Sequence, residues 1–126
     1  MKILTAILLS LVLLSGCAAE SAAGTYEQIS QAQAMELMQT EDNYVILDVR
    51  TEKEYQEGHI AGAVNLPNEN IDSHNLSLLP DKNQMILVYC RSGNRSKQAS
   101  QKLADLGYTE VKEFGGINTW TGKMEK

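Results

Sequence analysis

The chain has 126 residues, a formal net charge of -5 at pH 7 and 43% hydrophobic side chains. This length suits one small domain. The acidic balance excludes the basic surface that is typical of a nucleic-acid-binding protein, so no nucleic-acid partner is expected.

The first 16 residues have the pattern of a secretory signal. Lys2 precedes an apolar stretch that runs from Ile3 to Leu14, and this stretch is shorter than the about 20 residues that a transmembrane helix needs. Leu14-Ser15-Gly16-Cys17 resembles the lipobox of bacterial lipoproteins, in which the cysteine becomes the lipidated first residue after cleavage. The alternative is an ordinary signal with a chance cysteine.

This pattern predicts three segments. They are a signal peptide at 1–16, a lipidated Cys17 with a flexible tether at 17–25, and one domain at 26–126. The protein is then an extracytoplasmic lipoprotein that touches the membrane only through its anchor. Cleavage removes Lys2 and leaves 10 basic against 16 acidic side chains, which changes the net charge from -5 to -6.

The first half of the domain alternates helix and strand signals. Ser30 and Gln33 form a capping box, and the helix that it starts should end near Thr40. The apolar run from Tyr44 to Val49 is typical of a strand that is covered on both faces. A second capping box, Thr51-x-x-Glu54, predicts a short helix that ends at Gly58, and residues 63–66 predict a strand before Pro67.

The second half repeats the alternation after a polar stretch at 68–79 that no pattern resolves. A turn at 80–83 leads into a buried strand over 85–89 that delivers Cys90. A helix begins at about Arg95 and stops at Gly107, and a last strand covers 110–114 before a short segment that ends at Trp120. The alternation predicts an α/β domain with a central parallel sheet and helices on both faces.

Cys90 lies where ligands bind in such sheets, at the carboxyl end of a strand. The loop that follows opens a helix, so unpaired backbone N–H groups and the partial positive charge of the helix end favour an anion there. A Cys90 thiolate gains from the same field, and Arg91 and Arg95 add positive charge. If Cys17 is lipidated, Cys90 is the only remaining thiol, and we interpret it as a nucleophile rather than as an inert buried cysteine.

Three segments resemble those of one family. The loop of residues 90–96, CRSGNRS, resembles the active-site loop of rhodanese-like sulfurtransferases. LDVRTEKEYQEGHIAGAVNLP, from Leu47 to Pro67, is similar to that family's first signature, and EFGGINTW, from Glu113 to Trp120, is similar to its carboxyl-terminal end. The resemblance covers the whole domain from Tyr26 onward and implies the rhodanese-like fold, with the active-site loop between a strand end and a helix N-terminus.

The resemblance implies a thiosulfate sulfurtransferase-like enzyme that works through a persulfide. Cys90 takes a sulfane sulfur from thiosulfate or polysulfide, a small anionic donor, and passes it to a thiol, cyanide-like or protein acceptor. The loop residues that bind the donor are expected to be Arg91, Ser92, Gly93, Asn94, Arg95 and Ser96. No metal or organic cofactor is needed for this chemistry, no general base is evident near Cys90, and a monomer is expected.

Other polar residues are interpreted as structural. Asp48 follows a buried strand and needs a partner, so Asp48, Arg50 and Glu54 predict an ion-pair or hydrogen-bond network near the loop. His59 lies inside the first signature, which favours a role in the fold over acid or base catalysis. Two separated histidines, His59 and His74, offer too few ligands for a zinc site.

Two alternatives to catalytic sulfur transfer stay open. A persulfide carrier, or a thiol-exchange or binding module, would need the same nucleophile, so the sequence hardly separates it from an enzyme. Phosphatase or arsenate reductase chemistry also uses a cysteine and an arginine around an anion. Such phosphatase loops hold five residues between the two, whereas Cys90 and Arg95 have four between them, and the smaller ring suits sulfur better than phosphate.

Overall fold

The computed structural model describes residues 24–126. The predicted signal peptide, Cys17 and most of the tether lie outside the described residues. The strands are β1 (Glu27–Gln28), β2 (Tyr44–Asp48), β3 (His59–Ile60), β4 (Val64–Asn65), β5 (Met85–Cys90), β6 (Glu110–Gly116) and β7 (Met124–Glu125). The helices are α1 (Gln31–Thr40), α2 (Glu52–Glu57) and α3 (Asn94–Asp105), with short 3-10 helices η1 (Asn68–Asn70) and η2 (Ile117–Thr119).

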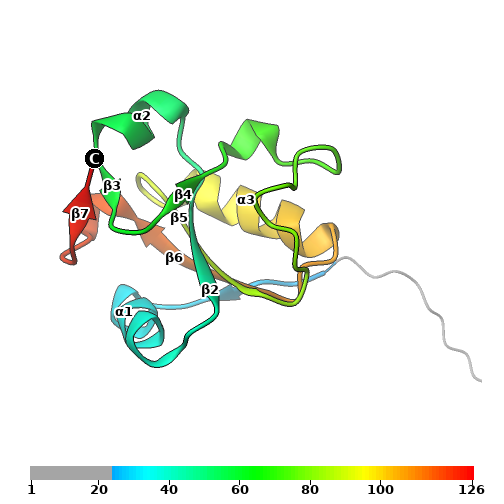
Figure 1. The fold of residues 1–126 in the computed structure, drawn as a ribbon, viewed down its shortest axis with the longest axis horizontal. Helices are drawn as coiled ribbons and strands as arrows, with labels where there is room; N and C mark the ends of the chain where they lie inside the picture. The colour runs from blue at the N-terminus through cyan, green and yellow to red at the C-terminus, as the bar shows by residue number, and fades with distance from the viewer. Residues whose placement is uncertain (1–23) are drawn as a thin grey trace, which may run out of the picture.

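Five strands form one parallel sheet in the order β1-β6-β5-β2-β4. β5 lies in the middle, paired with β2 on one side and β6 on the other, so Cys90 emerges from the centre of the sheet. A separate antiparallel pair joins β3 to the C-terminal β7. Figure 1 shows α1 and α3 on opposite sides of the sheet, as the sequence predicted.

Alternation along the strands divides the core into two clusters. Val88 and Cys90 of β5 point toward α3, where they pack with Leu103. Leu87 and Tyr89 point to the other face and pack with Ala34 of α1. Successive side chains of a strand face opposite ways, so residue 90 belongs to the α3 face, under the helix that begins just after it.

Both predicted capping boxes are present and explain where the first two helices begin. The Ser30 side chain accepts from the Gln33 N–H at 3.0 Å, and the Gln33 side chain accepts from the Ser30 N–H at 2.8 Å. Thr51 and Glu54 are paired in the same way at α2, which ends at Gly58 with φ at +148°. Helix positions could be predicted because these caps are local features of the sequence.

The structure differs from the predicted elements mainly at strands. β6 runs two residues further than expected, to Gly116, and β4 covers only two of the four predicted residues. The strands β1, β3 and β7 were not predicted, because a two-residue strand has no periodicity to detect. Their existence depends on pairing with distant segments.

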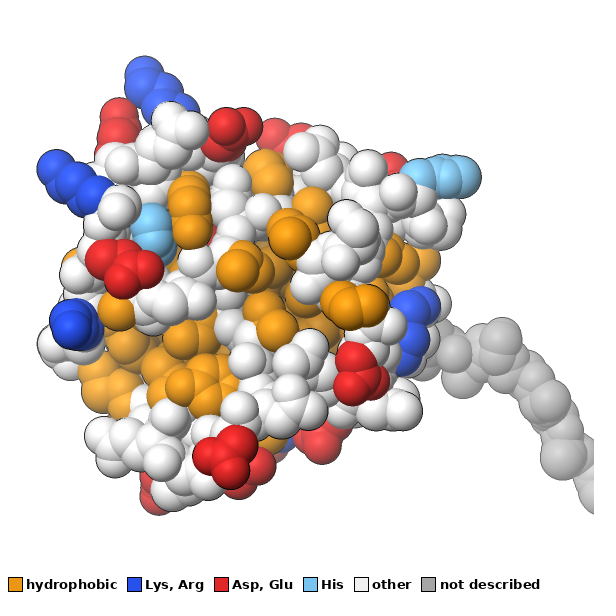
Figure 2. All heavy atoms as spheres, viewed as in Figure 1, with side chains coloured by type: hydrophobic (Ala, Val, Ile, Leu, Met, Phe, Trp, Pro, Cys, Tyr) orange, Lys and Arg blue, Asp and Glu red, His pale blue; other side chains and the backbone are white. Residues whose placement is uncertain are grey.

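Among residues 24–126, none of the helices is long and apolar enough to cross a membrane. Figure 2 shows hydrophobic side chains gathered between α1 and the β3–β7 pair, where the second core cluster approaches the surface. Acidic side chains are spread over the same view rather than collected in one patch.

Candidate functional site

Cys90 lies at the end of β5 with 1% of its surface exposed, and it is a free thiol. Its Sγ accepts a hydrogen bond from the backbone N–H of Gly93 at 3.0 Å. On its other side the Ser96 Oγ lies 3.4 Å away. The loop N–H that points at the sulfur is thus a backbone donor available to negative charge that develops there.

The loop after Cys90 is held in shape by two glycines. Gly93 has φ at +114° and is the N-cap of α3, a left-handed conformation that residues with a Cβ adopt only with strain. A Cβ on Gly116 would overlap the carbonyl oxygen of Arg91, so β6 touches the loop backbone directly. That carbonyl also accepts from the Asn118 N–H at 3.2 Å, which fixes the loop from the side of η2.

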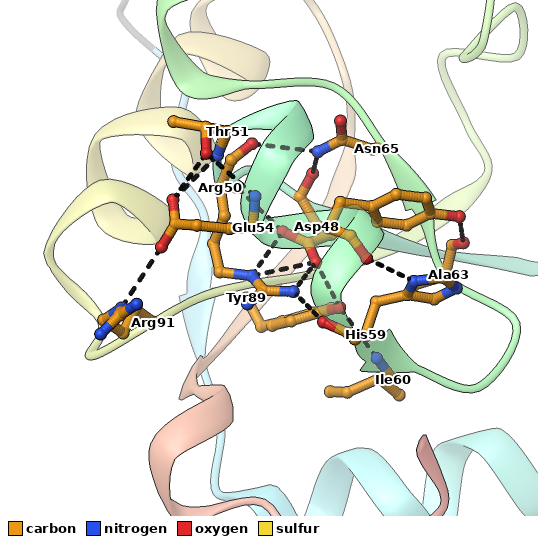
Figure 3. Close-up of polar contacts among 12 residues, drawn as sticks. Asp48, Arg50, Thr51, Glu54, His59, Ile60, Ala63, Asn65, Tyr89 and Arg91 are labelled. Carbon is orange, nitrogen blue, oxygen red and sulfur yellow. Dashed lines mark hydrogen bonds and ion pairs between the residues drawn. The ribbon is translucent and has the colours of Figure 1, made fainter. Parts of the chain in front are cut away.

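Arg91 and Arg95 both reach Glu54 of α2. Arg95 donates from Nη1 and Nη2 to the two carboxylate oxygens at 2.7 and 3.1 Å, and Arg91 donates from Nε at 3.3 Å. Figure 3 shows Glu54 between Arg91 and Thr51. From the sequence, Glu54 is expected in a structural network and the two arginines are expected to bind the sulfur donor. In the structure, both arginines are hydrogen-bonded to Glu54. Two guanidinium groups against one carboxylate leave a net positive charge beside the loop.

The Arg95 hydrogen bonds hold the pKa of Glu54 well below its usual range. In the unfolded chain this carboxyl has its ordinary pKa of 4.5, so on acidification the unfolded state binds a proton first. Glu54 therefore stabilises the fold fully above about pH 4.5, and this contribution is lost as the pH falls further. We expect Glu54→Gln to unfold with a flatter dependence on pH below 5, measured by urea unfolding.

The matched control for this prediction is Glu57→Gln, because Glu57 is exposed on the same helix. It should keep the wild-type slope of unfolding free energy against pH. An equally steep slope in Glu54→Gln would contradict the prediction.

Asp48 and Arg50 form a buried pair, as the sequence predicted. Arg50 donates to the Asp48 carboxylate from Nη2 at 2.7 Å and from Nε at 3.0 Å, with side-chain exposures of 6% and 0%. The Tyr89 hydroxyl donates to Asp48 at 2.6 Å and accepts from the Ile60 N–H at 3.1 Å. Figure 3 shows these groups converging between β2, α2 and β3, so the pair ties the strand ends together.

His59 lies in the same region, buried against Tyr55. Its ring stacks on the Tyr55 ring with centroids 3.8 Å apart, and its Nδ1 lies 2.9 Å from the Tyr55 carbonyl oxygen. Its Nε2 lies 3.4 Å from the Glu125 carboxylate of β7. The two ring nitrogens thus contact α2 and the C-terminal strand rather than Cys90, which favours the structural interpretation.

Glu113 is a site residue that sequence reasoning missed. It is 2% exposed, and its carboxylate accepts from the Ser96 hydroxyl at 2.5 Å and from the Gly115 N–H at 2.9 Å. Ser96, predicted to bind the donor, is itself fully buried and lies between Glu113 and Cys90. The available signal was strand alternation, which puts Glu113 on the same face of β6 as the buried Val111.

A buried cysteine at a strand end, in a loop that opens a helix, defines a thiol-dependent site on a parallel α/β sheet. The family described as "Rhodanese-like domain" matches residues 30–123. This range covers most of the chain, and the chain belongs to the rhodanese-like domain family. The predicted fold and the predicted family are both confirmed.

Named relatives agree with this membership. Thiosulfate sulfurtransferase PspE of Escherichia coli is 39% identical over 71 residues, which are 56% of this chain and 68% of the relative. Thiosulfate sulfurtransferase GlpE of Coxiella burnetii is 40% identical over 96 residues, 75% of this chain and 87% of the relative. A solved structure, "rhodanese with anions from E. coli", superposes with a TM-score of 0.61 at 35% identity and covers 66% of this chain and 98% of that one. The chain is an enzyme of the sulfurtransferase type.

Proposed function

We propose that the protein transfers a sulfane sulfur from thiosulfate, or from a polysulfide, to a thiophilic acceptor through a persulfide on Cys90. The Cys90 thiolate attacks the outer sulfur of thiosulfate, a new S–S bond forms, and the old S–S bond breaks so that sulfite leaves with its electron pair. The acceptor then attacks the terminal sulfur of the persulfide. That step regenerates the Cys90 thiolate and completes the catalytic cycle.

The observation that carries this proposal is the Gly93 N–H directed at the Cys90 Sγ at 3.0 Å. No side chain caps the first turn of α3, so the N–H groups of that turn are available to an anion at the loop. Arg91, Ser92 and Asn94 are exposed around the buried sulfur. A charged persulfide sulfur would be stabilised by the same donors as the thiolate.

The arginines support an anionic donor. Their ion pairs with Glu54 leave one net positive charge beside the loop, which offsets the repulsion between a thiolate and the thiosulfate dianion. Arg95 is held more firmly beside the loop than Arg91. It makes two hydrogen bonds to Glu54 and is 33% exposed, whereas Arg91 is 60% exposed. We infer that Arg95 holds both the loop and the donor.

Steady-state turnover with thiosulfate and cyanide tests the proposal. We expect the wild type to release thiocyanate over many cycles, and Arg95→Ala to lower kcat/KM for thiosulfate about tenfold or more. Its free energy of unfolding should fall by no more than about 1 kcal/mol, because the pair is partly solvated. Lys53→Ala, which removes an exposed positive charge from α2, is the matched control. A wild type that loads sulfur once without turnover would favour a persulfide carrier.

We also propose that residues 1–16 are a signal peptide and that Cys17 is lipidated, so that the domain is tethered outside the cytoplasm. The support is the order of Lys2, the apolar stretch and Leu14-Ser15-Gly16-Cys17 in the sequence. In a bacterial host we expect the full chain in the membrane fraction with a diacylglycerol on Cys17, detected by mass analysis. Cys17→Ser should abolish both, and identical fractionation of the two would contradict the proposal.

A further inference from the structure

Glu113 is a buried carboxylate without a cationic partner among residues 24–126. It is 2% exposed, and none of the ion pairs in the described part of the chain includes it. Burial of an unpaired charge destabilises a fold, and a serine or an alanine at this position would avoid that cost. Because Glu113 also lies next to the active-site loop, we expect its carboxylate to contribute to the chemistry of Cys90.

Hydrogen bonds connect Glu113 to the reactive sulfur through one residue. The Ser96 hydroxyl lies 2.5 Å from the Glu113 Oε2 and 3.4 Å from the Cys90 Sγ. Two carbonyl oxygens, of Gly93 at 3.0 Å and Gly115 at 3.4 Å, compete for the hydroxyl proton, but the carboxylate is nearest. A distance of 2.5 Å is typical of a strong O–H donor to a charged oxygen.

A serine hydroxyl can donate one hydrogen bond and accept another at the same time. Ser96 can thus accept the Cys90 S–H while it donates to Glu113. The reversed arrangement is equally complete, with Glu113 donating to Ser96 and Ser96 donating to a Cys90 thiolate. In that second state the sulfur also receives the Gly93 N–H at 3.0 Å, so the thiolate has two donors.

We propose that Glu113 is a positioning residue that takes the proton of Cys90 through Ser96. The thiol proton moves to the Ser96 Oγ while the Ser96 hydroxyl proton moves to the Glu113 Oε2, which leaves a thiolate and a neutral carboxylic acid. No electron is gained or lost, and the three groups carry one negative charge before and after. This inference rests on the proposed function only in that Cys90 is the nucleophile.

The surroundings favour one shared negative charge. A carboxylate and a thiolate linked by a single hydroxyl repel each other, and the proposed proton transfer avoids placing both charges side by side. Glu113 also lines an open cavity of about 480 Å³ together with Lys97 and Ser92. Gln28 of β1 offers a neutral amide at 3.4 Å from the Glu113 Oε1.

Several of the other charged groups near the loop interact with one another rather than with Glu113. Arg95 interacts electrostatically with Cys90 but is hydrogen-bonded to Glu54. Glu27 and Lys112 pair with each other at 2.6 Å. Besides Glu113 itself, the charged side chains of β1, β6, α3 and the loop are Glu27, Arg91, Arg95, Lys97, Lys102, Asp105, Glu110 and Lys112, and Glu54 and Glu69 act on Arg95 from α2 and η1. The variants that test the proposal leave all of these unchanged.

The test is the rate of Cys90 alkylation by iodoacetamide as a function of pH in the full chain, followed by mass analysis of the Cys90 peptide. Glu113→Gln keeps the size of the side chain and an oxygen for the Gly115 N–H, but it cannot take the proton. We expect alkylation at about pH 7 to be about tenfold slower than in the wild type, with the pH profile moved to higher pH. The variant should unfold at the same or a higher urea concentration, because a buried unpaired carboxylate is removed.

A second pair of variants tests the middle of the path. Ser96→Ala should slow alkylation as Glu113→Gln does, and Ser96→Thr, which keeps the hydroxyl, should restore the wild-type profile. An unchanged profile in Glu113→Gln would overturn the proposal. Faster alkylation would overturn it too, because the charge of Glu113 would then oppose the thiolate instead of accepting its proton.

A merely structural Glu113 would lower the urea midpoint of unfolding without moving the pH profile, and this result would also overturn the proposal. The alkylation assay contains no sulfur donor. Failure of the proposed sulfur transfer is therefore detected separately, as a wild type that releases no thiocyanate, and it does not change the result for Glu113.

Discussion

Replacement of Cys90 by serine is expected to lower thiocyanate formation by at least about a thousandfold, because a serine hydroxyl is not ionised near neutral pH and forms no persulfide. Turnover with thiosulfate and cyanide measures the effect. The fold should survive, because serine is nearly the size of cysteine and the Gly93 N–H and Ser96 hydroxyl that now contact Sγ remain available to its oxygen.

The control for Cys90→Ser is a urea unfolding experiment that shows whether the variant is folded. The only tryptophan of the chain, Trp120, packs against the second core cluster, so its fluorescence reports unfolding. An unchanged urea transition together with lost turnover assigns the loss to chemistry. Turnover retained in the serine variant would contradict a mechanism through Cys90.

Asp48→Ala is expected to lower the free energy of unfolding by about 3–5 kcal/mol, the range typical of breaking a buried ion pair on one side. The substitution leaves the 5% exposed Arg50 without its carboxylate and also removes the acceptor of the Tyr89 hydroxyl. Urea unfolding followed by Trp120 fluorescence measures the loss. The variant should lose activity only in proportion to the unfolded fraction.

The matched control for Asp48→Ala is Glu27→Ala. Glu27 pairs with Lys112 at 2.6 Å, a distance as short as those in the buried pair, but its side chain is 62% exposed. Its loss should therefore lower the free energy of unfolding by less than about 1 kcal/mol. A similar small loss in Asp48→Ala would contradict the role given to the buried pair.

Much of the fold followed from local signals in the sequence. The capping boxes at Ser30 and Thr51 placed two helices, and the apolar runs before Asp48 and Cys90 placed the central strands. The short strands at His59 and Met124 could not be predicted, because they exist only through the pairing of His59 with Glu125 and of Ile60 with Met124, segments far apart in the sequence. Strand pairing of this kind depends on tertiary contacts that no local pattern encodes.

The candidate site was predictable only where its residues are neighbours in the sequence. Cys90 and its loop follow one another in sequence, so strand, loop and helix could be read together. Glu54 and Glu113 reach the loop from α2 and β6, at separations of 41 residues from Arg95 and 17 from Ser96. Their contacts depend on how the sheet is assembled, which is why Glu54 was assigned only a general structural role and Glu113 was missed.

The measurement that tests the central claim most directly is mass analysis of the Cys90 peptide from the full-length protein after thiosulfate treatment. The account predicts one added sulfur atom on Cys90, which cyanide removes as thiocyanate, and no added sulfur in Cys90→Ser. A Cys90 peptide that stays unmodified while the protein still turns over thiosulfate would contradict the persulfide mechanism.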